Sequence, residues 1–131
     1  MEQVPYGGWS RCARLVAGGV EVLVTLEVGP RVIRFGRVGG PNMLVEYEKD
    51  MGKTGGDEYR SYGGHRLWTA PEDKVRTYEA DNQPVVHKEM NGWNEFRTPV
   101  GPQKIEKAIR VLTDAQEERV VLEHELTNRR D

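Results

Sequence analysis

Cysteine is almost missing from this chain, because Cys12 is the only one among its 131 residues. A single cysteine excludes an intrachain disulfide, so the fold must depend on its own hydrophobic core. Cys12 lies within a predicted strand and has no histidine near it in the sequence, so we do not expect a catalytic thiol. This cysteine content fits a reducing compartment, and we expect a cytoplasmic protein.

Long apolar runs and an excess of basic charge are also lacking. No stretch of about 18 apolar residues occurs, so we expect no membrane-spanning helix and no membrane partner. Residues 1–16 have no basic region followed by an apolar core, so we expect no signal peptide. With 19 basic and 21 acidic residues the net charge is -2, which predicts no nucleic-acid partner. No P-loop, dinucleotide fingerprint or nucleophile elbow is present, and we expect no cofactor.

Alternation of apolar and polar residues with a period of two is the dominant pattern. In residues 20–28 the apolar side chains from Val20 to Val28 share one face, while Leu23 lies among the polar residues of the other face. Gly18-Gly19 predicts a hairpin turn that joins this segment to a preceding strand. The remaining strands predicted in the first two thirds of the chain are 11–17, 31–38, 43–48, 75–80 and 84–90.

The last third of the chain has two possible interpretations. Residues 103–114 have a composition that suits a helix, but Ile105, Ile109 and Val111 also fit one face of a strand. The loop 115–118 then leads into a strand over 119–128, on which Val120, Leu122 and Leu126 share a face. We interpret both segments as long antiparallel strands. The predicted fold is therefore an all-β antiparallel sandwich in one domain, residues 1–131.

One segment, "SYGGHRLWTAPE" at residues 61–72, carries more chemistry than a connecting loop needs. It follows a long glycine-rich and charged stretch, 49–64, and loops of this length are often functional. Two glycines allow a tight backbone path or the close approach of a ligand. Arg66 can bind a carboxylate or vicinal hydroxyls, Trp68 offers a flat apolar face for a sugar ring, and His65 can exchange a proton near neutral pH.

A purely structural role explains the same residues. Arg66 can pair with an acid and Trp68 can pack in the core, since buried polar groups normally have partners. His124 lies on an apolar strand face, where a histidine serves either as a hydrogen-bonded core residue or as a ligand-binding group. A metal site built from His65, His87 and His124 with Glu46 or Glu72 has suitable donors but none of the close ligand spacings, so we predict no metal.

The middle third of the chain gathers further groups that recognise hydroxyls. Asp81, Trp93 and Asn94 accompany other polar and aromatic residues on predicted loops and short strands. Aromatic faces combined with a few polar groups are what a carbohydrate pocket requires. We therefore predict binding of a monosaccharide or sugar derivative by His65, Arg66, Trp68, Glu72, Tyr78, Asn82 and His124.

Four stretches of the chain carry a resemblance to a known family. They are "GPRVIRFGRVGGPNML", "GGHRLWTAPE", "RTYEADNQPV" and "EKAIRVL" with "VVLEHELTN". In this order they resemble the first half of bacterial proteins of the galactose mutarotase-like, or aldose 1-epimerase-like, group. The likeness is closest to an uncharacterised branch with a G-G-H-R-L-W-x-A-P-E motif, and it runs through nearly the whole chain.

The resemblance implies half of a β-supersandwich with a sugar pocket on a concave face. Characterised mutarotases open and close the hexose ring at C1 with a histidine acid and a glutamate base, and an arginine and a second histidine hold hydroxyls. Arg66 matches the sugar-binding arginine, with His65 beside it. Full-length members have about twice this length, and the segments expected to carry the catalytic pair lie beyond residue 131, so neither catalytic residue is assigned.

Two functions follow as hypotheses. The first is a mutarotase-like, carbohydrate-binding domain. The second is a non-catalytic, half-length relative that acts as an oligomeric binding or assembly module. An apolar face on the last predicted strand, with no later strand to protect its edge, predicts a homodimer that contacts there. The alternative is that loop 49–64 covers that face.

Overall fold

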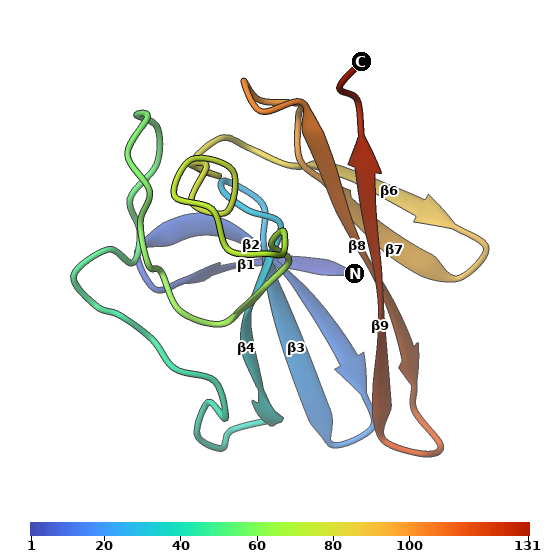
Figure 1. Cartoon of the computed structure of the whole chain (residues 1–131). Helices are drawn as coiled ribbons and strands as arrows, with labels where there is room; N and C mark the ends of the chain where they lie inside the picture. Colours follow the sequence, from blue (N-terminus) through green and yellow to red (C-terminus); the bar gives the residue numbers. More distant parts are fainter.

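The computed structural model describes all 131 residues, and its regular elements are strands only (Figure 1). They form two antiparallel sheets that pack as a sandwich, which confirms the all-β prediction. None of the elements is a helix with the length and apolar character that a membrane crossing requires. The first sheet has the order β1 (Glu2–Tyr6), β2 (Trp9–Ala17), β3 (Val20–Thr25), β4 (Arg31–Arg37), β5 (His65–Arg66). The second has the order β6 (Val86–Met90), β7 (Trp93–Arg97), β8 (Ile105–Asp114), β9 (Arg119–Asn128).

The main hydrophobic core lies between the two sheets. Val22 and Val24 from β3 pack in one buried cluster with Phe96 from β7 and with Ile109 and Val111 from β8. The period-two pattern places all of them except Phe96 on inward faces, because successive side chains of a strand point to opposite sides. Burying this apolar surface is the main force that holds the sheets together.

The opposite face of the first sheet is covered as well, by the long loop between β4 and β5 (Figure 1). Leu23 and Ile33 on this face are buried together with Trp9 and Tyr62, and Met51 of the loop packs against them. The Trp9 indole N–H donates to the carbonyl of Lys53 at 3.0 Å, which fixes the loop to the sheet. A second core therefore explains why Leu23 interrupts the polar side of its strand.

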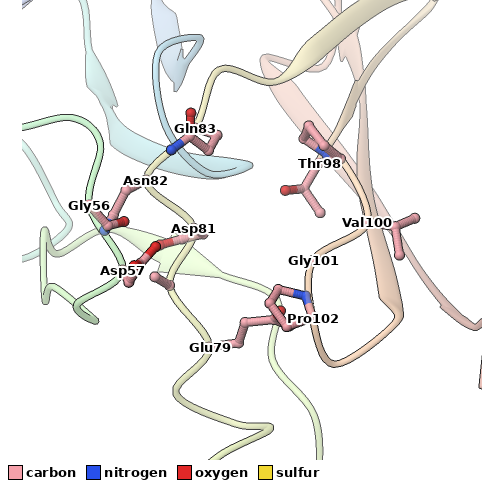
Figure 2. A pocket seen from close by; sticks show the side chains of 12 residues that line it. Gly56, Asp57, Glu79, Asp81, Asn82, Gln83, Thr98, Val100, Gly101 and Pro102 are labelled. Carbon is pink, nitrogen blue, oxygen red and sulfur yellow. The ribbon is translucent and has the colours of Figure 1, made fainter.

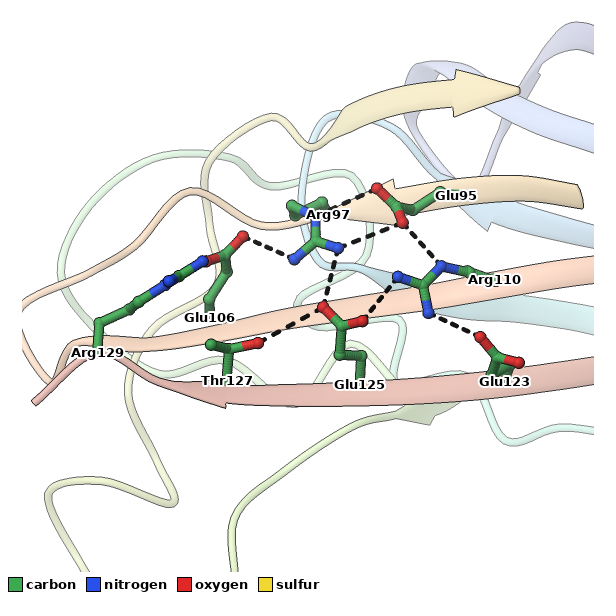
Figure 3. A network of polar contacts seen from close by, with 8 residues as sticks. All are labelled: Glu95, Arg97, Glu106, Arg110, Glu123, Glu125, Thr127 and Arg129. Carbon is green, nitrogen blue, oxygen red and sulfur yellow. Dashed lines mark hydrogen bonds and ion pairs between the residues drawn. The ribbon is translucent and has the colours of Figure 1, made fainter. Parts of the chain in front are cut away.

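The outer face of the second sheet carries a network of ion pairs instead of an apolar layer (Figure 3). Arg110 of β8 contacts Glu95, Glu123 and Glu125 at 2.7–2.8 Å, and Arg97 contacts Glu125 at 3.0 Å. The two guanidinium groups lower the pKa of Glu125 to about 2. The network spans β7, β8 and β9, so it links three strands from the solvent side.

Two predicted strands are replaced by other structure. Residues 43–48 form only an isolated bridge, Glu46 with Gly63, and β5 pairs with β4 only at Arg31 and Val32. Further along β4, the Asn42 side chain accepts from the Phe35 N–H and donates to the Ile33 carbonyl, so a side chain takes the place of a neighbouring strand. Residues 75–80 form no strand, and 74–78 form a turn. There the Asp73 carboxylate accepts hydrogen bonds from the backbone N–H groups of Val75 and Arg76, which is how an aspartate caps a helical turn. This local side-chain bonding overrides the weak strand pattern.

Three strands were not predicted, β1, β5 and β7. The β6–β7 hairpin turns at Asn91-Gly92, where both residues have positive φ angles of 51° and 85°. Asn-Gly is the strongest short-range signal for such a hairpin, but "NGWNEF" was interpreted only as a source of polar groups. The ambiguous segment 103–114 is a strand, β8, and the strand predicted over 119–128 is β9.

The apolar face of β9 is partly covered within the chain. Val120 and Leu122 pack against the main core, whereas Leu126 is 45% exposed. Loop 49–64 lies on the other side of the first sheet, with Met51 in its second core, and so does not cover this face. β9 is the last strand of its sheet and pairs with β8 alone.

Candidate functional site

The turn at Gly63-Gly64 places the two residues of β5 beside β4. In this pairing Arg66 lies opposite Arg31, and His65 lies opposite Val32. Both glycines have positive φ angles, and a Cβ on Gly64 would overlap the backbone carbonyl of Val32. Glycine is therefore needed for the close approach of one backbone to another. The sequence alone left open whether a backbone or a ligand came close here.

The Arg66 guanidinium is surrounded by aromatic rings. Its central carbon lies 4.6 Å from the ring centre of Trp68, 4.8 Å from that of Tyr59 and 5.8 Å from that of Tyr78. Such distances are typical of cation–π contacts. The guanidinium makes one hydrogen bond, from Nη2 to the carbonyl of Thr77 at 3.1 Å. Burial lowers the pKa of Arg66 from its ordinary value.

The predicted structural role of this segment is not what the geometry shows for Arg66 and Trp68. No carboxylate forms an ion pair with Arg66, and the Trp68 side chain is 49% exposed and not part of either core. Tyr78 is one of the three rings around Arg66, which together form the aromatic cluster, and its hydroxyl donates to the exposed Glu72 carboxylate. Glu72 thus holds an aromatic ring in place.

Arg66 lines a hollow of about 430 Å³, which we call the Arg66 hollow. Two tyrosines, Tyr47 and Tyr59, add to the aromatic surface of Trp68. No aspartate or glutamate lines it. The side chains that carry its chemistry are those of Arg31, Tyr47, Tyr59, Ser61, His65, Arg66 and Trp68.

Arg31 belongs to the site but was missed. Its guanidinium is almost fully buried and donates to the carbonyl of Gly63 at 2.7 Å and to the Asp81 carboxylate at 3.2 Å. It therefore ties the glycine turn to the segment that contains Asp81. The signal was present in the sequence, because an arginine next to an apolar pair in a buried strand needs a fixed partner.

His65 and His124 meet across the two sheets. Their Nε2 atoms lie 2.7 Å apart, so one ring donates the hydrogen bond and the other accepts it as a neutral imidazole. Burial, the neighbouring His124 and Arg31 all lower the pKa of His65. His124 is exposed and belongs to neither core, so it does not serve as a buried core residue on an apolar face.

His65 also borders a second, apolar hollow of about 290 Å³. This hollow lies between the first sheet and β9. Its remaining lining is apolar and consists of Val22, Val32, Phe35, Leu44, Val120 and Leu122.

Asn82 is buried away from the Arg66 hollow and holds loops together. Its Oδ1 accepts from the Tyr62 hydroxyl at 2.5 Å, and its Nδ2 donates to the carbonyls of Gly56 and Glu58 at 3.1 and 2.7 Å. Both polar atoms are thus engaged within the chain. That a ligand contacts Asn82 remains a prediction.

Asn82 lies beside a third hollow, of about 250 Å³, between segment 79–83 and the loop 98–102 (Figure 2). This hollow is acidic, with Asp57, Glu79 and Asp81 in its lining and no basic residue. The Glu79 carboxylate accepts a hydrogen bond from the backbone N–H of Gln103.

The histidines do not gather at one point. His87 lies on β6, where its Nε2 is 2.7 Å from Asn94 Oδ1 and its ring lies against Phe96. No group of three or more histidine, cysteine, aspartate and glutamate side chains is arranged to hold a metal ion.

Comparisons with protein-family models, curated proteins and solved structures found no match to this chain. Of the predicted ligand-binding residues, the fold brings His65, Arg66 and Trp68 to one hollow, places His124 against His65, and puts Tyr78, bonded to Glu72, in the aromatic cluster.

Proposed function

We propose that this chain is a carbohydrate-binding domain of the galactose mutarotase-like type, with the Arg66 hollow as its sugar site. The observation that carries the proposal is the combination of Trp68, Tyr47 and Tyr59 with the donors of Arg66 and Ser61 around one hollow of about 430 Å³. Volumes of this size are typical of small-molecule sites. Aromatic faces receive the C–H face of a pyranose, while the polar groups bind its hydroxyls.

The proposal is for binding and does not extend to ring opening. The His65–His124 pair supplies a neutral imidazole at the edge of the hollow, which is a suitable acid or base near neutral pH. A mutarotase-type reaction also needs a carboxylate base, and the lining of the hollow contains none.

Replacing Trp68 by alanine should weaken sugar binding about tenfold or more, because stacking of the sugar on its exposed ring is lost. Stacking contacts of aromatic rings are worth about 0.5–1.5 kcal/mol beyond the buried area. Isothermal titration with a panel of methyl glycosides measures the affinity. Trp93→Phe is the matched control, since Trp93 lies on β7 outside the hollow. Equal affinity of Trp68→Ala and the unmodified chain would remove Trp68 from the site.

A second candidate function, assembly through a homodimer, is favoured by one observation. β9 has a free edge, and Leu126 near its end is exposed. The apolar hollow of about 290 Å³ borders the first half of the same strand at Val120 and Leu122. A free strand edge is a template for pairing with another chain, and a two-fold dimer covers two such edges at once. We propose a second copy of this chain as the partner.

Light scattering at micromolar concentration should therefore give a mass of about twice 14.9 kDa. Leu126→Glu should reduce the mass to that of one chain without unfolding it, because Leu126 is exposed in the single chain. Val100→Glu introduces the same charge at an exposed valine in the loop 98–102 and should leave the dimer intact. A single-chain mass for the unmodified protein would contradict the dimer.

A further inference from the structure

The Arg66 hollow has an unbalanced positive charge. Arg31 and Arg66 lie directly opposite each other on paired strands, and like charges in this position destabilise a sheet. The lining of the hollow adds no aspartate or glutamate. The imbalance is local, because the whole chain has a net charge of -2.

Arg31 is compensated, and Arg66 is not. Arg31 is paired with Asp81 and also donates to the carbonyl of Gly63. Arg66 donates one hydrogen bond to a neutral carbonyl, that of Thr77, and has no carboxylate within ion-pair distance. A guanidinium has five N–H donors, so about four remain without a protein acceptor. No nitrogen of Arg66 is both buried and unpartnered, which means that these free donors reach solvent.

A half-buried cation without an acid costs free energy, because part of its hydration is lost. The three aromatic rings offset some of this cost through cation–π contacts. Ring faces do not satisfy the N–H groups, which lie in the plane of the guanidinium. A carboxylate does so with two parallel hydrogen bonds, since its geometry matches the guanidinium fork.

We infer that the Arg66 hollow takes a sugar acid, a pyranose that carries a carboxylate, with the carboxylate on Arg66 and the ring against the neighbouring aromatic side chains. This inference rests on the proposed carbohydrate-binding function and names its ligand class. The acidic hollow beside Asn82 repels the same ligand, because Asp57 and Glu79 line it without a basic residue, while the charge of Asp81 is paired with Arg31. A carboxylated sugar is thereby directed to one of the two hollows.

The test uses matched ligands that differ only at C6, which is a carboxylate in the uronide and a hydroxymethyl group in the neutral glycoside. Methyl β-D-glucuronide is titrated against methyl β-D-glucoside, and methyl α-D-galacturonide against methyl α-D-galactoside, by calorimetry at pH 7.5 and low salt. The uronides should bind about 10- to 100-fold more tightly than the neutral glycosides, the range that corresponds to a charge-assisted hydrogen-bonded pair. The preference should shrink in 0.5 M NaCl, because salt screens exposed charges. Inorganic phosphate is titrated separately to detect binding of any anion.

Three variants test whether the preference for the uronide comes from the Arg66 guanidinium. Arg66→Gln should remove the preference for the uronide while the neutral glycoside still binds. Arg66→Lys keeps the charge but loses the bidentate geometry, so it should retain only part of the preference. Arg76→Gln changes the net charge equally at a residue paired with Asp73 outside the hollow, and it should retain the full preference. Urea denaturation of each variant shows whether it is folded. If Arg66→Gln is unfolded, the comparison of Arg66→Lys with the unmodified chain decides the outcome.

The outcomes separate this inference from the proposed function. Equal binding of uronides and neutral glycosides overturns the sugar acid but leaves the carbohydrate site in place. Binding of phosphate that competes with the uronide and equals it in affinity also overturns the inference, because the site is then a general anion site. Failure of all four glycosides to bind refutes both proposals.

Discussion

Replacing Phe96 by alanine should lower the free energy of unfolding by about 3–5 kcal/mol, the range for truncating a buried aromatic side chain. Phe96 is 0% exposed and joins side chains of both sheets in the main core. Native domains are stable by only about 5–15 kcal/mol, so this variant should unfold at a much lower urea concentration. The transition is followed by circular dichroism.

Phe35 provides a matched control, because the chain has only two phenylalanines. Phe35 lies on the adjacent part of the first sheet but is 36% exposed, at the rim of the apolar hollow. Phe35→Ala should cost less, about 1–2 kcal/mol, because more than a third of Phe35 is already exposed and its truncation at a rim leaves no enclosed cavity. Equal losses for the two variants would mean that the sheets do not pack around Phe96 as the structure describes.

Replacing Asn82 by alanine should lower the free energy of unfolding by about 2–4 kcal/mol, because it leaves the proton of a buried hydroxyl without an acceptor and opens a cavity. The hydroxyl is that of Tyr62, which is fully buried, whereas the carbonyls of Gly56 and Glu58 belong to exposed residues. Urea denaturation of the variant measures the loss.

Gln83→Ala is the control for Asn82→Ala. Gln83 is the exposed neighbour of Asn82, and surface substitutions normally stay within about 0.5 kcal/mol. Sugar titration separates the two roles of Asn82. If Asn82→Ala keeps the stability of the unmodified chain but loses sugar affinity, Asn82 binds the ligand and does not support the loops.

Patterns that depend on neighbouring residues were readable from the sequence. The period-two alternation identified the strands around 11–17, 20–28, 31–38 and 119–128, because burial of one face of a strand imposes that period. The same reasoning identified the segment that contains His65, Arg66 and Trp68, because its residue types and their spacing are local properties. The resemblance to mutarotase-like proteins stays an expectation.

Relations between distant residues were decided by the tertiary structure. The sequence cannot show that Arg66 lacks an acid, because that depends on Asp81 pairing with Arg31 some 50 positions away. It cannot show that His65 meets His124, because the contact joins two sheets, 59 positions apart in the chain.

The two predicted strands that do not form show the same limit. Residues 43–48 have the alternation of a strand, but β5 pairs with the start of β4 and the Asn42 side chain bonds the backbone of Ile33 and Phe35 further along it. By itself the sequence determined which segments have one apolar face and which carry reactive side chains. The tertiary structure decided which faces are covered and which charges are paired, because burial and pairing are set by whatever else folds against each segment.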